Sequence, residues 1–161
     1  MEKKELGVAV IGSGRIGSLR ANMATRHPSV RFLAIADKDP ERANNLAESV
    51  TANMSSGDNL EVISHPEVTT VFVSTPEHDH VEAILQAVEL GKPVFVEKPL
   101  ALTVEDADKI IAAVEKTGVE LRIGYSRRHD RRWMLTKEQI VQGRVGEIMG
   151  ITSRVYNTRA Q

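Results

Sequence analysis

The sequence contains no cysteine, which excludes disulfide bonds, zinc–thiolate sites and thiol nucleophiles among its 161 residues. It also lacks an excess of charge of either sign, since the formal net charge is −1 at pH 7. A nearly neutral chain has no general attraction to nucleic acids or anionic membranes. No apolar run approaches the roughly 20 residues that span a bilayer, and residues 1–5 lack the apolar core of a signal peptide. We therefore expect a cytoplasmic protein without a nucleic-acid or membrane partner.

Short apolar segments alternate with amphipathic segments along most of the chain. The patterns predict strands over residues 6–11, 30–36, 70–74, 93–96 and 119–124. They predict helices over residues 16–26, 40–50, 80–90, 104–117 and 130–142, with a loop over 51–58 and a helical turn over 60–64. Such alternation is typical of a Rossmann-type, doubly wound α/β fold, in which a mostly parallel sheet carries helices on both faces.

A glycine-rich loop lies between the first predicted strand and the first predicted helix. Gly12 suits a tight turn, Gly14 lets the backbone approach a pyrophosphate, and Gly17 lets the helix pack closely on the strand. Asp37 ends the second strand, 20 residues beyond Gly17, where a carboxylate can accept hydrogen bonds from ribose hydroxyls. The strand before the loop, the helix after it, the second strand and the acid at the end of that strand together predict a dinucleotide site. The alternative interpretation is a structural turn with a surface acid.

The choice between NAD and NADP depends on the charges around Asp37. A carboxylate at this position repels a 2′-phosphate and favours NAD. Lys38 and Arg42 follow closely in the sequence and keep NADP open as the alternative, because either cation could reach a 2′-phosphate if Asp37 turned away.

Further segments follow the later strands, and with the glycine loop they resemble the Gfo/Idh/MocA family of oxidoreductases, the group of glucose-fructose oxidoreductase and inositol dehydrogenase. The segments that carry the resemblance are Thr75-Pro76 with His80, residues 91–94, Glu97-Lys98-Pro99 and residues 124–128. The resemblance implies an NAD(P)-dependent enzyme that transfers a hydride between nicotinamide and a small hydroxy compound such as a sugar or polyol. One departure is Glu77, which stands where the family usually has asparagine.

By this resemblance, Lys98 is the catalytic residue. An alcohol that loses a hydride must also lose its hydroxyl proton, and an ammonium group can stabilise the charge on that oxygen and relay the proton. Burial would lower the pKa of such a lysine and ease the relay. Glu97 would lie near the nicotinamide and hold Lys98, and the resemblance also suggests a cis peptide bond between Lys98 and Pro99.

The residues expected to bind the cofactor come from the glycine loop, the end of the second strand and the segments after the later strands. They are Gly12, Ser13, Gly14, Arg15, Ile16, Asp37, Lys38, Ser74, Thr75, Pro76, His80, Glu97, Lys98 and Arg127. For His80, a local hydrogen bond at the start of its helix is an equally weighted interpretation. His78 and His80 lack an evident third ligand, so no metal site is predicted.

The last predicted strand, over residues 147–156, has no following helix and no partner strand in the sequence. We expect residues 1–146 to form the NAD(P)-binding Rossmann domain and residues 147–161 to lead into a C-terminal substrate domain that the chain lacks. The family carries its acid/base histidine in that domain, so we expect dinucleotide binding with little dehydrogenase activity by this chain alone. The alternatives are a stand-alone nucleotide-binding module or a subunit that is completed by another chain, including self-association through the unpaired strand.

Overall fold

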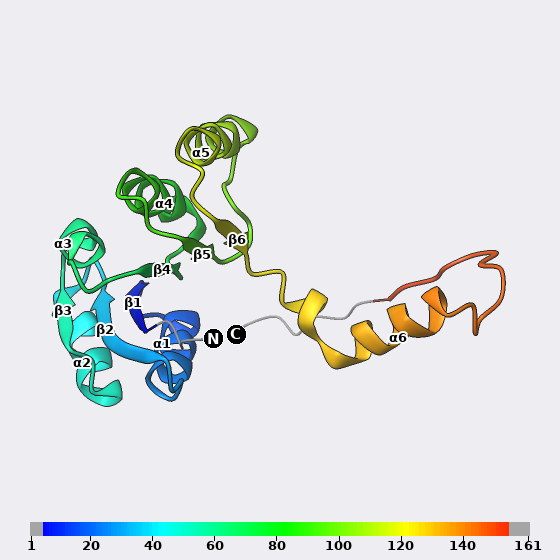
Figure 1. The fold of residues 1–161 in the computed structure, drawn as a ribbon, viewed down its shortest axis with the longest axis horizontal. Helices are drawn as coiled ribbons and strands as arrows, with labels where there is room; N and C mark the ends of the chain where they lie inside the picture. Colours follow the sequence, from blue (N-terminus) through cyan, green and yellow to red (C-terminus); the bar gives the residue numbers. More distant parts are fainter. Residues whose placement is uncertain (1–4, 155–161) are drawn as a thin grey trace. The chain divides into compact units, whose positions relative to one another are not determined.

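The computed structural model describes residues 5–154. The chain divides into two units between Gly124 and Tyr125. The first unit contains a sheet with its helices, and the second contains a single longer helix after a short 3-10 turn (Figure 1). The predicted domain boundary at residue 146 falls inside the second unit and stays a prediction.

The first unit is built on six parallel strands in the order β3-β2-β1-β4-β5-β6. The strands are β1 (Leu6–Ile11), β2 (Val30–Ala36), β3 (Met54–Ser56), β4 (Thr70–Val73), β5 (Val94–Val96) and β6 (Leu121–Ile123). The strand order reverses between β1 and β4, which is the place where open α/β sheets bind their ligands. The Rossmann-type fold predicted from the sequence is confirmed.

The register of the sheet aligns the carboxyl ends of its strands. Ile11, the last residue of β1, lies opposite Ala36 of β2 and Val73 of β4. Val73 in turn lies opposite Val96 of β5. The residues that follow these strands therefore leave the sheet along one edge, and every segment to which the sequence assigned a role within residues 5–124 begins there.

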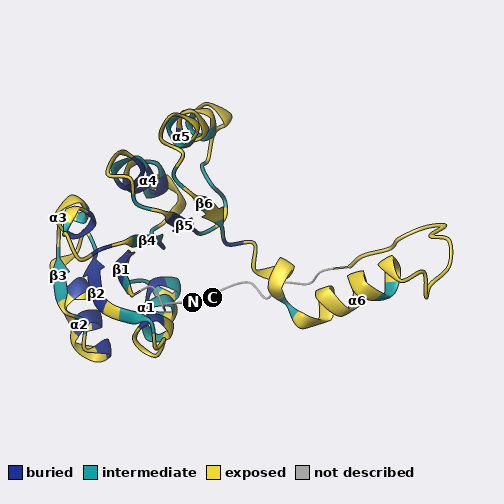
Figure 2. Cartoon of the chain, in the orientation of Figure 1, coloured by how far each residue is buried: buried dark blue, intermediate teal, exposed yellow. Residues whose placement is uncertain are grey.

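Helices cover both faces of the sheet, and each face has its own hydrophobic core. The helices of this unit are α1 (Arg15–Thr25), α2 (Pro40–Val50), α3 (Asn59–Ser64), α4 (His80–Glu89) and α5 (Val104–Thr117). Val8 and Val10 of β1 belong to the core formed with α1 and α2. Ala9 and Ile11 belong to the core formed with α3, α4 and α5. Because alternate residues of a strand point to opposite faces, β1 is buried on both sides (Figure 2).

Three helix ends of this unit are set by residues whose type suits the position. Asp39 caps α2 by accepting hydrogen bonds from the N–H groups of Glu41 and Arg42. Thr103 caps α5, which ends at Gly118 with a φ of 69°. A left-handed residue of this kind is the usual helix terminator, since glycine adopts it without steric cost.

The second unit contains the 3-10 turn η2 (Ser126–His129) and helix α6 (Arg131–Val141). Asp130 caps α6 by accepting a hydrogen bond from the N–H of Arg132. None of the residues of α6 is buried (Figure 2). Among residues 5–154, no helix is both long and apolar enough to cross a membrane.

Two sequence predictions about strands were wrong. Residues 54–56 were expected in a loop but form β3, which pairs with β2 at the edge of the sheet; its serines give no hydropathy signal, because backbone pairing alone defines it. Residues 147–154 were expected in a strand but form none, and 155–156 lie outside the described residues. A strand needs a neighbour for its backbone groups, and an alternating apolar pattern does not supply one. Self-association through this segment stays a prediction.

The core on the α4 face can be tested at Ile84, which is 0% exposed. We expect Ile84→Ala to lower the free energy of unfolding by about 2–5 kcal/mol, because it leaves a cavity that the packed neighbours cannot fill. Ile111→Ala is the matched control, because that side chain is 47% exposed on α5; its loss is expected to be about 1 kcal/mol or less. Urea unfolding followed by circular dichroism measures both, and equal losses would contradict this assignment of the core.

Candidate functional site

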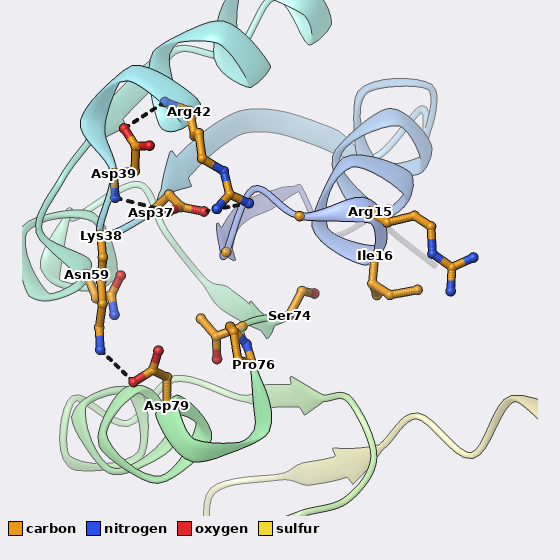
Figure 3. Close-up of a pocket in the computed structure, with 13 residues that line it drawn as sticks. Arg15, Ile16, Asp37, Lys38, Asp39, Arg42, Asn59, Ser74, Pro76 and Asp79 are labelled. Carbon is orange, nitrogen blue, oxygen red and sulfur yellow. Dashed lines mark hydrogen bonds and ion pairs between the residues drawn. The ribbon is translucent and has the colours of Figure 1, made fainter. Parts of the chain in front are cut away.

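A cleft of about 530 Å³ opens at the carboxyl edge of the sheet, where the strand order reverses (Figure 3). It is lined by Gly12, Gly14, Arg15, Ile16, Asp37, Lys38, Asp39, Arg42, Asn59, Ser74, Thr75, Pro76 and Asp79. The structure thus brings together most of the predicted cofactor residues, from the loops that follow β1, β2 and β4. Ser13 lies beside the lining, while His80, Glu97, Lys98 and Arg127 are not part of it.

The three glycines of the loop differ in what surrounds them. Gly12 has a φ of +97°, and a Cβ added there would lie 2.8 Å from backbone atoms of Ser74 and Thr75. A Cβ on Gly17 would lie 1.7 Å from the carbonyl oxygen of Gly12. On Gly14 it would meet only Arg42 Nη2, at 3.8 Å. Backbone packing therefore requires glycine at positions 12 and 17, whereas Gly14 leaves bare backbone at the cleft.

Helix α1 begins at this loop and directs its N-terminus into the cleft. Gly14 is its N-cap residue, and no side chain accepts a hydrogen bond there. The first turn contains no acidic residue either. The first N–H groups of a helix lack partners within the helix, and they lie at the positive end of the helix dipole. This end of the cleft is consequently suited to an anionic group such as a phosphate.

Asp37 lines the same cleft, beside the glycine loop, and is held in place by backbone donors. Its Oδ2 accepts a hydrogen bond from the N–H of Ser13 at 2.6 Å, and its Oδ1 accepts one from the N–H of Asp39 at 3.0 Å. Arg42 Nη2 lies 3.8 Å from Oδ2. The first bond ties the end of β2 to the glycine loop, so the two halves of the cleft are fixed to each other.

Lys38 and Asp79 form an ion pair across the cleft, with 2.5 Å between Nζ and Oδ1 (Figure 3). Lys38 follows β2, and Asp79 ends the 3-10 turn η1 (Glu77–Asp79) that precedes α4. The hydrogen bond to the Asp79 carboxylate raises the pKa of the Lys38 ammonium above its ordinary value. Sequence analysis missed Asp79, since nothing local relates residues 38 and 79.

His80 lies behind the cleft and is only 1% exposed. Its Nδ1 lies 2.9 Å from the carbonyl oxygen of Pro99, and its Nε2 lies 3.1 Å from the carbonyl oxygen of Thr75. These contacts reach beyond the first turn of α4, and a place for His80 beside the cofactor stays a prediction. Both ring nitrogens face backbone carbonyls, so the ring joins the segment after β4 to the segment after β5.

Glu97 pairs with Arg20, a residue that sequence analysis did not single out. The guanidinium carbon of Arg20 also lies 4.2 Å from the centroid of the Phe95 ring, a distance typical of a cation–π contact. Arg20 follows Gly17 by three residues and shares its inward helix face. A charged residue on the face of α1 that packs against the sheet was the available signal.

Lys98 follows Glu97 directly, and its peptide bond to Pro99 is cis, as the resemblance suggests. Its side chain is exposed. The burial expected for this lysine is therefore absent. Lys98 stands two residues beyond the end of β5, and the described residues do not cover it there. Arg127 belongs to the second unit, where it lines a separate hollow with Arg128, Trp133, Met134 and Lys137. Its expected place beside the cofactor stays a prediction.

Two buried hydroxyl groups near the cleft have no hydrogen-bond partner among the described residues. They are Ser13 Oγ in the glycine loop and Thr75 Oγ1 after β4. Buried polar atoms are normally paired, so these two suit a polar ligand in the cleft. Within residues 5–154, no three histidine, aspartate or glutamate side chains gather where they could hold a metal ion.

The chain is similar to inositol dehydrogenases. Residues 6–125 match the model of an oxidoreductase family with an NAD-binding Rossmann fold, GFO_IDH_MocA. The scyllo-inositol 2-dehydrogenase (NAD(+)) of Bacillus subtilis is 34% identical over 86% of this chain and 41% of its own length. The myo-inositol 2-dehydrogenase of Thermotoga maritima is 33% identical over 91% and 45%. The chain thus spans less than half the length of these relatives.

Solved structures agree with the sequence matches. The myo-inositol dehydrogenase of Lactobacillus casei, in complex with NAD(H) and myo-inositol, superposes with a TM-score of 0.82. Its sequence identity is 28%, over 88% of this chain and 43% of that one. A probable dehydrogenase from Thermotoga maritima gives a TM-score of 0.83 at 33% identity, over 88% and 42%.

The packing of the glycine loop predicts that an alanine destabilises the fold at position 17 but not at position 14. We expect Gly17→Ala to lower the free energy of unfolding by about 3 kcal/mol, since the new Cβ would collide with the Gly12 carbonyl and push α1 off the sheet. Gly14→Ala, the matched control, should stay within about 1 kcal/mol of wild type, because only a flexible arginine tip lies near. Urea unfolding compares them, and a stable Gly17→Ala variant would refute the close approach of helix and strand.

Proposed function

This chain belongs to the Gfo/Idh/MocA oxidoreductase family, and from that premise we propose that its cleft holds NAD for hydride transfer to or from a polyol or sugar. The observation that carries the proposal is the pair of features that line one cleft, the open N-terminus of α1 and the fixed carboxylate of Asp37. Hydride transfer and the choice of substrate are proposed for the whole protein, whereas the cleft that would hold NAD lies in this chain.

Different residues of the cleft bind different parts of the cofactor. The N–H groups at the start of α1 bind the pyrophosphate, and the bare backbone of Gly14 lets it approach. Asp37 accepts hydrogen bonds from the adenosine ribose hydroxyls. Ser13 and Thr75 supply the two unpaired hydroxyl groups. The fit of these donors and acceptors to a dinucleotide supports the assignment, and the carboxylate of Asp37 favours the unphosphorylated ribose of NAD.

Lys98 acts on the substrate hydroxyl. Its ammonium stabilises the negative charge that develops on the oxygen, and it relays the proton by releasing one of its own to water as it takes up the proton that the alcohol loses. Bound NAD would supply the hydride acceptor for this step. The exposure of Lys98 at the carboxyl end of β5 leaves its ammonium accessible to a ligand.

The residues on both sides of Lys98 are anchored to other parts of the fold. Arg20 of α1 holds the Glu97 carboxylate, and His80 of α4 contacts the Pro99 carbonyl oxygen at 2.9 Å. Arg20 and His80 are thus positioning residues, because they fix the backbone from which Lys98 extends. The names of similar proteins, which include scyllo- and myo-inositol dehydrogenases, support a cyclic polyol as the substrate class.

Cofactor binding can be measured on this chain directly. We expect NAD to bind in a calorimetric titration and Asp37→Ala to weaken that binding about tenfold, since two ribose hydrogen bonds are lost. Asp108→Ala, which removes an exposed carboxylate on α5, is the control and should bind NAD like wild type. A thermal melt establishes that Asp37→Ala remains folded. If wild-type chain did not bind NAD, the proposed function would fail.

The role of Lys98 can be tested in the natural full-length gene product. We expect Lys98→Met to lower kcat for polyol oxidation by about 10²- to 10⁴-fold, the usual contribution of a positioned proton-transfer group. NADH formation over a panel of inositols and sugars gives the rates, and Lys116→Met at the end of α5 is the control. A wild-type protein that bound NAD but oxidised none of these compounds would indicate a binding module instead.

A further inference from the structure

Two cations stand beside the carboxylate that favours NAD. Lys38 is the next residue after Asp37, and Arg42 lies on the first turn of α2; both line the cleft. A 2′-phosphate on the adenosine ribose carries negative charge to this end of the cleft, and lysine and arginine are its usual partners. Asp37 alone therefore does not explain why the site should reject NADP.

Both cations already face a carboxylate. Arg42 Nη2 lies 3.8 Å from Asp37 Oδ2, and Lys38 Nζ lies 2.5 Å from Asp79 Oδ1. The Lys38 side chain is 64% exposed and has the length to move, whereas the Asp79 side chain is only 16% exposed. The position of the pair is consequently set by Asp79.

Asp79 does not cap the helix that it precedes. It occupies the N-cap position of α4, where aspartate normally accepts a hydrogen bond from the N–H groups of its own helix. No such bond is present. Its carboxylate instead points across the cleft to Lys38 (Figure 3). His78 Nε2 lies 3.5 Å from its other oxygen.

We propose that Asp79 is a specificity-determining residue, which holds the Lys38 ammonium away from the ribose 2′ position and so disfavours NADP. To engage a 2′-phosphate, Lys38 would have to leave Asp79, and the released carboxylate would remain in the same cleft as the phosphate. NAD has a neutral ribose and makes no such demand. This inference rests on the proposed function, since it concerns the same NAD site.

The test is a double-mutant cycle in which this chain is titrated with NAD and NADP. The measured quantity is the ratio of the two dissociation constants, NADP over NAD. We expect Asp79→Asn to lower this ratio about threefold to tenfold, the scale of one exposed ion pair and one nearby charge. Raising the salt concentration should reduce the effect, because these charges are screened.

The cycle is completed by Lys38→Met alone and by the double variant Asp79→Asn/Lys38→Met. Because Asp79 acts through Lys38, Lys38→Met should weaken NADP binding more in the Asp79→Asn background than in wild type. Asp79→Ser serves as a second variant, because serine also removes the charge and is a good N-cap residue. Asp106→Asn is the matched control: it breaks an Asp–Lys pair of 3.0 Å on α5, outside the cleft, and should leave the ratio as in wild type.

Three results would overturn the inference, and each has a distinct meaning. A ratio unaffected by both Asp79→Asn and Asp79→Ser would show that the residue does not influence specificity. An equal shift with and without Lys38 would show that Asp79 acts by its own charge alone. Failure of the wild-type chain to bind either dinucleotide would remove the NAD site itself, and with it the proposed function.

Discussion

The site depends on one close approach between backbone segments. At Gly17 the first helix comes so near the end of β1 that the Gly12 carbonyl oxygen occupies the space of a side chain, with an ideal Cβ only 1.7 Å away. This contact fixes the direction in which α1 leaves the sheet, and thereby places its N-terminus in the cleft. The other groups that line the cleft are thereby placed around the N-terminus of this helix.

The sheet places the other segments of the site along one edge. Because the strands are parallel and in register at their carboxyl ends, Asp37, Ser74 and Glu97 emerge along one edge although long stretches of chain separate them. A few side-chain contacts join these loops. Asp37 bonds to the loop after β1, and His80 contacts the segments after β4 and β5. The scaffold therefore positions the residues approximately, and the contacts complete the positioning.

Sequence patterns predicted the parts of the molecule that local chemistry determines. The buried strands and the helices over residues 40–50 and 104–117 each carry a signal within a few residues, and all are present. The edge strand β3 was missed, because its pairing with β2 leaves no hydropathy signature. The absent strand over residues 147–154 has the same origin, since a pattern cannot show whether a partner exists.

Most of the residues predicted for the site line one cleft. The prediction lacked the ion pairs, which join residues distant in sequence: 77 positions separate Arg20 from Glu97, and 41 separate Lys38 from Asp79. These pairs shape the electrostatics of the cleft. Lys38 and Arg42 each face a carboxylate, whereas the first turn of α1 has no capping side chain and no acidic residue of its own. In the proposed NAD complex, the uncompensated positive end of the helix dipole would face the pyrophosphate, and the paired cations would face the neutral ribose.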